Sequence, residues 1–126
     1  MTDKRPVNLS IPTIRLPITA YVSILHRVSG VVLIAAFGIF LYCLHFSLAS
    51  EQDFQKTIAC ITSMPVKLII WACLAALIYH SCAGIRHLIM DMGIGEDLKG
   101  GVLGAQIALA ASAILIALSF FWVMSW

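Results

Sequence analysis

The sequence predicts an all-α integral membrane protein with three transmembrane helices, because its composition and three long uncharged stretches both indicate a lipid environment. Of the 126 residues, 61% are apolar and 11% are charged, whereas soluble domains contain about one-quarter charged residues. The uncharged stretches cover residues 28–50, 68–85 and 100–126. Each is close to the roughly 17–25 residues with which a helix crosses a bilayer.

Proline, serine and glycine residues set the expected helix boundaries. The first helix should begin near residue 18 or 19, because Pro17 ends an arm that is also interrupted by Pro6 and Pro12. Ser63 is a candidate N-cap for the second helix, with Pro65 in its first turn. We therefore expect an N-terminal cytoplasmic or interfacial arm over residues 1–17 and a membrane domain over residues 18–126. Its helices should cover about 19–50, 63–91 and 102–126, and the two connections are expected to be short loops. Glycines mark the second connection: Gly93, Gly95, Gly100 and Gly101.

The distribution of Lys and Arg predicts the orientation in the membrane. Basic residues accumulate on the cytoplasmic side of membrane proteins. Six lie on the side of the N-terminus and of the second connection, and two lie on the other side: Lys4, Arg5, Arg15, Arg27, Arg86 and Lys99 against Lys56 and Lys67. The N-terminus is therefore predicted to be cytoplasmic.

Composition also excludes several classes of function. The chain carries a net charge of +2 and no basic run, so a nucleic-acid partner is not expected. The four cysteines form no CxxC pair, which argues against a disulfide framework or a zinc site. The first apolar stretch is too long and begins too late for a cleaved signal peptide. Because the segment before it also lacks transit-peptide character, we expect a retained, multi-pass protein of a bacterial inner membrane. No segment is long enough for a soluble catalytic domain, so any enzyme activity must be shared with partners.

Polar residues gather on one face of the first predicted helix. Ser23, His26, Arg27 and Gly30 follow i, i+3, i+4, i+7 spacing. An arginine within a membrane helix costs about 2.5–3.5 kcal/mol at the centre and less near an end, so Arg27 asks for a partner or for snorkelling to the headgroups. Ser23 and His26 lie on the same face as Arg27, which favours a binding site over snorkelling.

The second predicted helix carries a sharper pattern. His80, Gly84, His87 and Asp91 share one face, and Arg86 lies beside it. An imidazole in hydrocarbon is a ligand for haem iron, and a glycine one turn away would leave space for the macrocycle. His80 lies about 9 Å deeper than Arg86, so propionates would reach cations nearer the cytoplasm. The alternative is that His80 only bonds a neighbouring helix, and that His87 and Asp91 form a capping or ion-pair network.

No second axial ligand is evident in the sequence. His87 lies about 10.5 Å further along the same helix as His80, and His45 lies at the opposite end of the first helix. The level of His26 suits the propionates better than the iron. A six-coordinate haem would therefore need a histidine from another chain. In the third helix, Gly104, Ala108 and Ser112 are interpreted as a packing surface of small residues.

Two stretches resemble one family. RPVNLSIPTIRLPITAYVSILHRVSG, residues 5–30, and HSCAGIRHLIMDMG, residues 80–93, are similar to the cytochrome b subunit of succinate dehydrogenase, the larger of its two hydrophobic anchors in many bacteria. The first keeps an S-x-x-H-R-x-S-G ending and the second keeps H-x-x-x-G-I-R-H. Together they cover about a third of the chain.

The resemblance implies cofactors, partners and site residues. His80 matches the axial ligand of haem b, with the second ligand from a companion small anchor subunit. Ser23 and Arg27 match positions that line the ubiquinone pocket. His26 and Arg27 match residues near the haem propionates, and His87 is placed there with them. The implied complex adds an iron–sulfur subunit and a flavoprotein that oxidises succinate, and this chain would be its non-catalytic anchor.

Two other interpretations stay open from sequence. One is the anchor of a fumarate reductase or another quinol-oxidising relative, because direction depends on cofactor potentials. The other is a haem-free structural or transport subunit whose polar faces only join helices.

Overall fold

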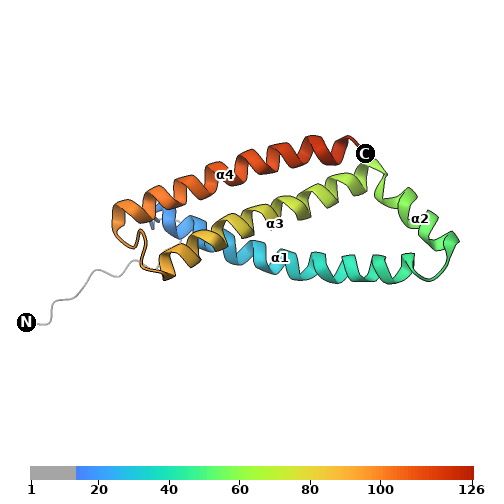
Figure 1. Cartoon of the computed structure of the whole chain (residues 1–126), viewed down its shortest axis with the longest axis horizontal. Coiled ribbons are helices and arrows are strands. Elements are labelled where there is room, and N and C mark those ends of the chain that lie inside the picture. Colours follow the sequence, from blue (N-terminus) through green and yellow to red (C-terminus); the bar gives the residue numbers. More distant parts are fainter. Residues whose placement is uncertain (1–13) are drawn as a thin grey trace, which may run out of the picture.

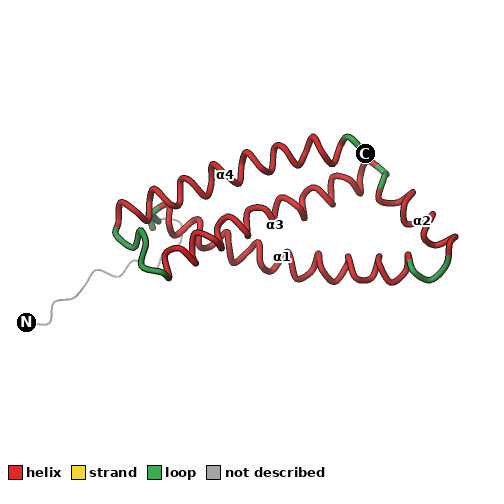
Figure 2. Tube along the Cα trace, in the orientation of Figure 1, coloured by secondary structure: helices red, strands yellow, loops and turns green. Residues whose placement is uncertain are grey.

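The computed structural model describes residues 14–126, which form four α-helices and contain no strand. The helices are α1 (Ile18–Ser47), α2 (Glu51–Ile61), α3 (Met64–Asp91) and α4 (Leu98–Met124). α1, α3 and α4 are each long and apolar enough to cross a membrane, which confirms the three predicted spans. They lie side by side as an elongated bundle, and the shorter α2 joins α1 to α3 at one end (Figures 1 and 2). Of the arm predicted for residues 1–17, residues 1–13 lie outside the described part of the chain.

The starts of α1 and α3 agree with the sequence. α1 begins directly after Pro17, and α3 begins after Ser63 with a proline in its first turn. The Ser63 side chain caps no backbone N–H of α3. Its hydroxyl instead donates a hydrogen bond of 2.6 Å to the Cys60 carbonyl. Proline and the extended backbone at Ser63 are therefore sufficient to define this helix start.

The connection between the first two spans is a helix, so the predicted short loop at this position was wrong. Ser50, expected as the last residue of the first span, is the N-cap of α2, and its hydroxyl accepts a hydrogen bond of 3.1 Å from the Asp53 amide. Glu51 and Asp53 lie in the first turn, where acidic side chains stabilise a helix. Lys56 pairs with Asp53 at 2.9 Å. Hydrogen bonds from Lys56 and Ser50 keep the pKa of Asp53 below its ordinary value.

The second connection is shorter than predicted. Asp97 accepts a hydrogen bond from the Gly100 amide at 3.3 Å and caps α4, which therefore starts at Leu98 and not near residue 102. Gly100 and Gly101 lie inside the helix. Gly93 and Gly95 remain in the turn, where their φ angles of 81° and 74° favour glycine.

The three spans meet most closely at the end where α1 begins, α3 ends and α4 begins. We call it the histidine end, because His26, His80 and His87 lie there. Val22, Ala83 and Ala105, one from each span, are fully buried and form the core. Small residues let membrane helices approach closely, and Ala108 and Ser112 of the predicted packing surface are buried in α4.

α1 separates from α3 toward the other end of the bundle (Figure 1). An apolar groove of about 610 Å³ lies between them there. It is lined by Leu33, Ile34, Ala36, Phe37, Phe40, Cys73, Leu74 and Leu77. The helices are therefore anchored to each other at the histidine end. The cytoplasmic placement of that end stays a prediction.

The turn before α4 gives a direct test of this geometry. A Cβ atom at Gly100 would lie 2.7 Å from the Gly95 Cα and 2.6 Å from Asp97 Oδ1, so the backbone of the turn must shift. A Cβ at Gly38 meets nothing within 4 Å. We expect Gly100→Ala to destabilise the protein by about 1–3 kcal/mol, the usual effect of overpacking, and Gly38→Ala to leave it at least as stable, because alanine has the higher helix propensity. Thermal unfolding in detergent measures both, and equal midpoints for the two variants would contradict the turn geometry.

Candidate functional site

His80 of α3 is held against the backbone of α1. Its Nδ1 lies 3.1 Å from the His26 carbonyl oxygen and 3.1 Å from the Ser29 hydroxyl. The Nδ1 and Cε1 edge of the ring faces Gly30, where a Cβ would lie 3.2 Å from Cε1. The glycine therefore allows the ring to rest directly on α1. Within residues 14–126, His80 Nε2 makes no hydrogen bond.

The His26 ring stacks on the His80 ring, with centroids 4.1 Å apart and an angle of 19° between the planes. His26 therefore lies directly beside His80, and its role near the propionates stays a prediction. Two axial ligands approach one iron from opposite sides of the macrocycle, and stacked rings do not have that arrangement. The structure brings the two histidines together, but it does not make them a ligand pair.

Gly84 has a different neighbour from the one expected. A Cβ there would lie 3.4 Å from His26 Nε2, so the space beside this glycine is taken up by the His26 ring. That Nε2 is buried and has no hydrogen-bond partner among the described residues. A buried donor or acceptor without a partner is costly, about 1–3 kcal/mol, and indicates a group that the isolated chain leaves unsatisfied.

His87 completes a row of three imidazoles. Its ring centroid lies 5.2 Å from that of His26, with the planes at 44°. The ion pair considered between His87 and Asp91 is not formed: Asp91 is exposed, and the only ion pair found in residues 14–126 joins Lys56 to Asp53. His87 is therefore part of the histidine cluster.

Ser23 and Arg27 lie on α1 beside this cluster. Ser23 is partly buried and Arg27 is exposed. Neither side chain forms a hydrogen bond to another described residue. The face predicted from helical spacing is therefore divided, with His26 and Gly30 packed on α3 and Arg27 open to its surroundings.

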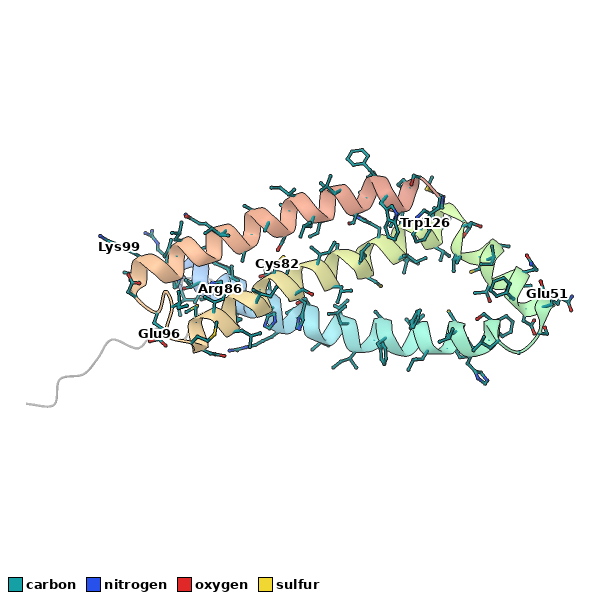
Figure 3. The ribbon with its side chains drawn as sticks, in the orientation of Figure 1. Glu51, Cys82, Arg86, Glu96, Lys99 and Trp126 are labelled. Atoms are coloured by element: carbon teal, nitrogen blue, oxygen red, sulfur yellow. The ribbon has the colours of Figure 1, made fainter. Side chains whose placement is uncertain are left out.

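Arg86 points away from the histidines and into the contact between α3 and α4. It is only 7% exposed, and its Nη2 donates a hydrogen bond of 3.2 Å to the Gly101 carbonyl. Gly104 is the matching small residue, because a Cβ there would lie 3.5 Å from Arg86 Nε. Figure 3 shows Arg86 within the bundle, whereas Glu96 and Lys99 lie at its end. Arg86 was expected beside the face that carries His80, and the structure shows that its side chain packs against α4.

Two contacts at this site were missed by sequence reasoning. Ser29 is buried, and its hydroxyl donates a bond of 2.7 Å to the His26 carbonyl while lying beside His80. Tyr79 donates a bond of 2.9 Å to the Val22 carbonyl and so joins α3 to α1. The sequence signal for Ser29 was its position in the S-x-x-H-R-x-S-G stretch, three residues after His26. No sequence signal identified the Val22 carbonyl as the partner of Tyr79, because every residue has a backbone carbonyl.

The described residues do not contain a complete metal site. No group of three or more His, Cys, Asp or Glu side chains is placed to hold a metal ion in residues 14–126. What is present is one imidazole with a fixed ring and a free Nε2, between two membrane helices. The fold and the site together define a polytopic helical membrane protein in which one imidazole is fixed between two of the spans.

The chain belongs to the succinate dehydrogenase/fumarate reductase transmembrane subunit family, which it matches over residues 1–119. It is 37% identical to the succinate dehydrogenase cytochrome b556 subunit of Coxiella burnetii, over 98% of this chain and 99% of that one. The subunits of the same name from Rickettsia felis and Paracoccus denitrificans are 33% and 30% identical. These alignments cover 90% and 91% of this chain and 88% of each relative. The resemblance seen in two sequence stretches is thus confirmed across nearly the whole chain.

The hydrogen bond from the Tyr79 hydroxyl to the Val22 carbonyl can be tested by mutation. Tyr79→Phe removes one hydrogen bond between α1 and α3 and keeps the ring. We expect a loss of about 0.5–1.5 kcal/mol in the free energy of unfolding. Tyr42→Phe is the matched control, because Tyr42 is 71% exposed. Equal stability of the two variants in detergent would show that the hydroxyl contributes nothing to the packing of α3 on α1.

Proposed function

We propose that this protein is the membrane-anchoring cytochrome b subunit of a bacterial succinate dehydrogenase, which shares the ligation of haem b and helps to form the ubiquinone reduction site. The observation that carries the proposal is the presentation of His80: a ring fixed through Nδ1 on α1, with Nε2 free, in a family of complex-bound membrane subunits. The three relatives described above are named as succinate dehydrogenase subunits, which favours succinate oxidation over fumarate reduction.

The residues at the histidine end fit a haem b. His80 would offer one nitrogen to the haem iron, and a second would come from a companion small anchor subunit, since stacked His26 is not placed to supply it. The buried His26 Nε2 without a partner is suited to a hydrogen bond with a propionate. Arg27 and, next to His26, His87 would add positive or donor groups for the same carboxylates. Haem b supplies a one-electron redox centre when it is bound.

Ser23 and Arg27 are proposed to bind ubiquinone. They are four residues apart on α1, on the same side of the helix. The hydroxyl and the guanidinium would donate hydrogen bonds to quinone oxygens, and the fixed positive charge of Arg27 would stabilise negative charge that develops during reduction. The exposure of Arg27 in this chain supports the proposal, because a residue that binds an external ligand has to be accessible. The chain's residues therefore orient the substrate, and the electrons come from outside the subunit.

The proposed complex contains three further subunits. A flavoprotein would oxidise succinate, an iron–sulfur subunit would carry single electrons to the membrane, and a second small hydrophobic subunit would complete the haem ligation. Large apolar side chains remain exposed along α1, among them Val31, Ile34 and Phe37. In a membrane protein such surfaces contact lipid or another transmembrane subunit. The inner membrane is the proposed location.

The haem proposal predicts the spectrum of the purified complex. A reduced-minus-oxidised spectrum should show a b-type α band, and electron paramagnetic resonance (EPR) should show a low-spin bis-histidine haem. His80→Leu should abolish that low-spin signal, because it removes one axial nitrogen. His45→Leu is the control, since His45 lies in the last turn of α1 at the opposite end. A wild-type complex without the α band would show that this protein is not a cytochrome subunit.

The quinone proposal predicts a selective loss of activity. Arg27→Leu should lower ubiquinone reduction by about tenfold or more, because a hydrogen bond to a charged group is worth about 1.5–3 kcal/mol. Ser23→Ala should lower it less. Succinate oxidation with an artificial dye acceptor should stay unchanged in both variants. Ser47→Ala, near the other end of α1, is the control, and normal ubiquinone reduction in both site variants would reject the assignment.

A further inference from the structure

The Ser29 hydroxyl has no assigned role, yet it lies at the point where α1 meets His80. The side chain is 7% exposed. It donates a hydrogen bond of 2.7 Å to the His26 carbonyl, the ordinary bond of a helical serine to its own backbone. Its oxygen also lies 3.1 Å from His80 Nδ1. One hydroxyl therefore contacts both the carbonyl and the imidazole.

The arrangement of these three atoms determines which histidine nitrogen carries the proton. His80 Nδ1 lies 3.1 Å from the His26 carbonyl oxygen, which is only an acceptor. The hydroxyl proton is already directed to the same carbonyl at 2.7 Å, so the serine oxygen faces Nδ1 with its lone pairs. Both neighbours of Nδ1 are thus acceptors, and the favourable tautomer has the proton on Nδ1. The lone pair of His80 is then on Nε2.

We propose that Ser29 is a positioning residue for the axial ligand: together with the His26 carbonyl it accepts the Nδ1 proton, fixes the His80 ring and raises the electron donation of Nε2 to a haem iron. This inference rests on the proposed function, because it needs a haem bound through His80. A hydrogen bond from the non-ligating nitrogen of a histidine to an acceptor orients the ring and increases its basicity. Stronger donation stabilises the ferric state, so Ser29 lowers the midpoint potential of the haem.

A purely structural role for Ser29 is the alternative. Small residues are common where membrane helices cross, and alanine would serve such a role equally well. Ser47 provides a comparison in the same helix, because its hydroxyl donates to the Leu44 carbonyl at 2.8 Å through the same i to i−3 bond. Ser47 is the last residue of α1 and lies far from the part of α1 that contacts His80. The two serines therefore differ in the contact with the imidazole.

The test uses the complete complex purified from membranes, with Ser29→Ala, Ser29→Thr and Ser47→Ala variants. Three quantities are measured: the ratio of haem to protein, the midpoint potential by optical redox titration, and the low-spin EPR signal of the oxidised haem. We expect Ser29→Ala to keep its haem, to shift the midpoint potential to more positive values and to broaden or shift the low-spin signal. Ser29→Thr, which restores a hydroxyl, should move both values back toward those of the wild type, and Ser47→Ala should match the wild type.

The other outcomes are equally decisive. Wild-type potential and EPR signal in Ser29→Ala would overturn the role of Ser29 and leave the proposed function intact. Loss of haem in Ser29→Ala with recovery in Ser29→Thr would support the role, whereas loss in both variants would overturn it in favour of a packing role. A wild-type complex without haem would instead reject the proposed function, and the inference with it.

Discussion

The close approach of three helices at one end of the bundle is the constraint on which the rest of the structure depends. Lipid tails are as apolar as the helix surfaces, so helix contact in a membrane relies on packing and on polar bonds. At this end Ala83 and Ala105 are buried, and Gly30 allows the His80 ring to rest on α1. Further along α1, larger residues such as Ile34 and Phe37 face this side. There α1 separates from α3, and an apolar groove lies between the two helices.

α3 is the central helix, because its polar side chains reach backbone carbonyls of both neighbours. A carbonyl that already accepts a helical bond has a second lone pair, so an additional donor does not disturb the helix. In low dielectric such bonds are the natural way to satisfy a polar side chain. Toward α1 the donors are Tyr79 and His80, and toward α4 they are Trp71 and Arg86. One of these bonds also orients the imidazole proposed as a haem ligand, so helix packing and ligand geometry share a single interaction.

The site is divided between what this chain satisfies internally and what it leaves open. His80 Nδ1 has two acceptors, whereas the buried His26 Nε2 has no partner among residues 14–126. Arg27 is exposed on the neighbouring turn. This division suits the proposed function, in which the ligands and a second histidine would come from outside the chain.

The sequence by itself determined the three spans and the starts of α1 and α3, because hydropathy and the positions of prolines are local properties. It missed α2, whose cap Ser50 was assigned to the preceding helix, and it began α4 late because the cap at Asp97 was overlooked. Only the tertiary structure decided that Gly84 faces His26, that Arg86 turns to α4 and that Ser29 meets His80. These contacts depend on the rotation and depth of one helix against another. Several hydrogen bonds between the helices are accepted by backbone carbonyls, and a backbone carbonyl is the same at every position of a sequence.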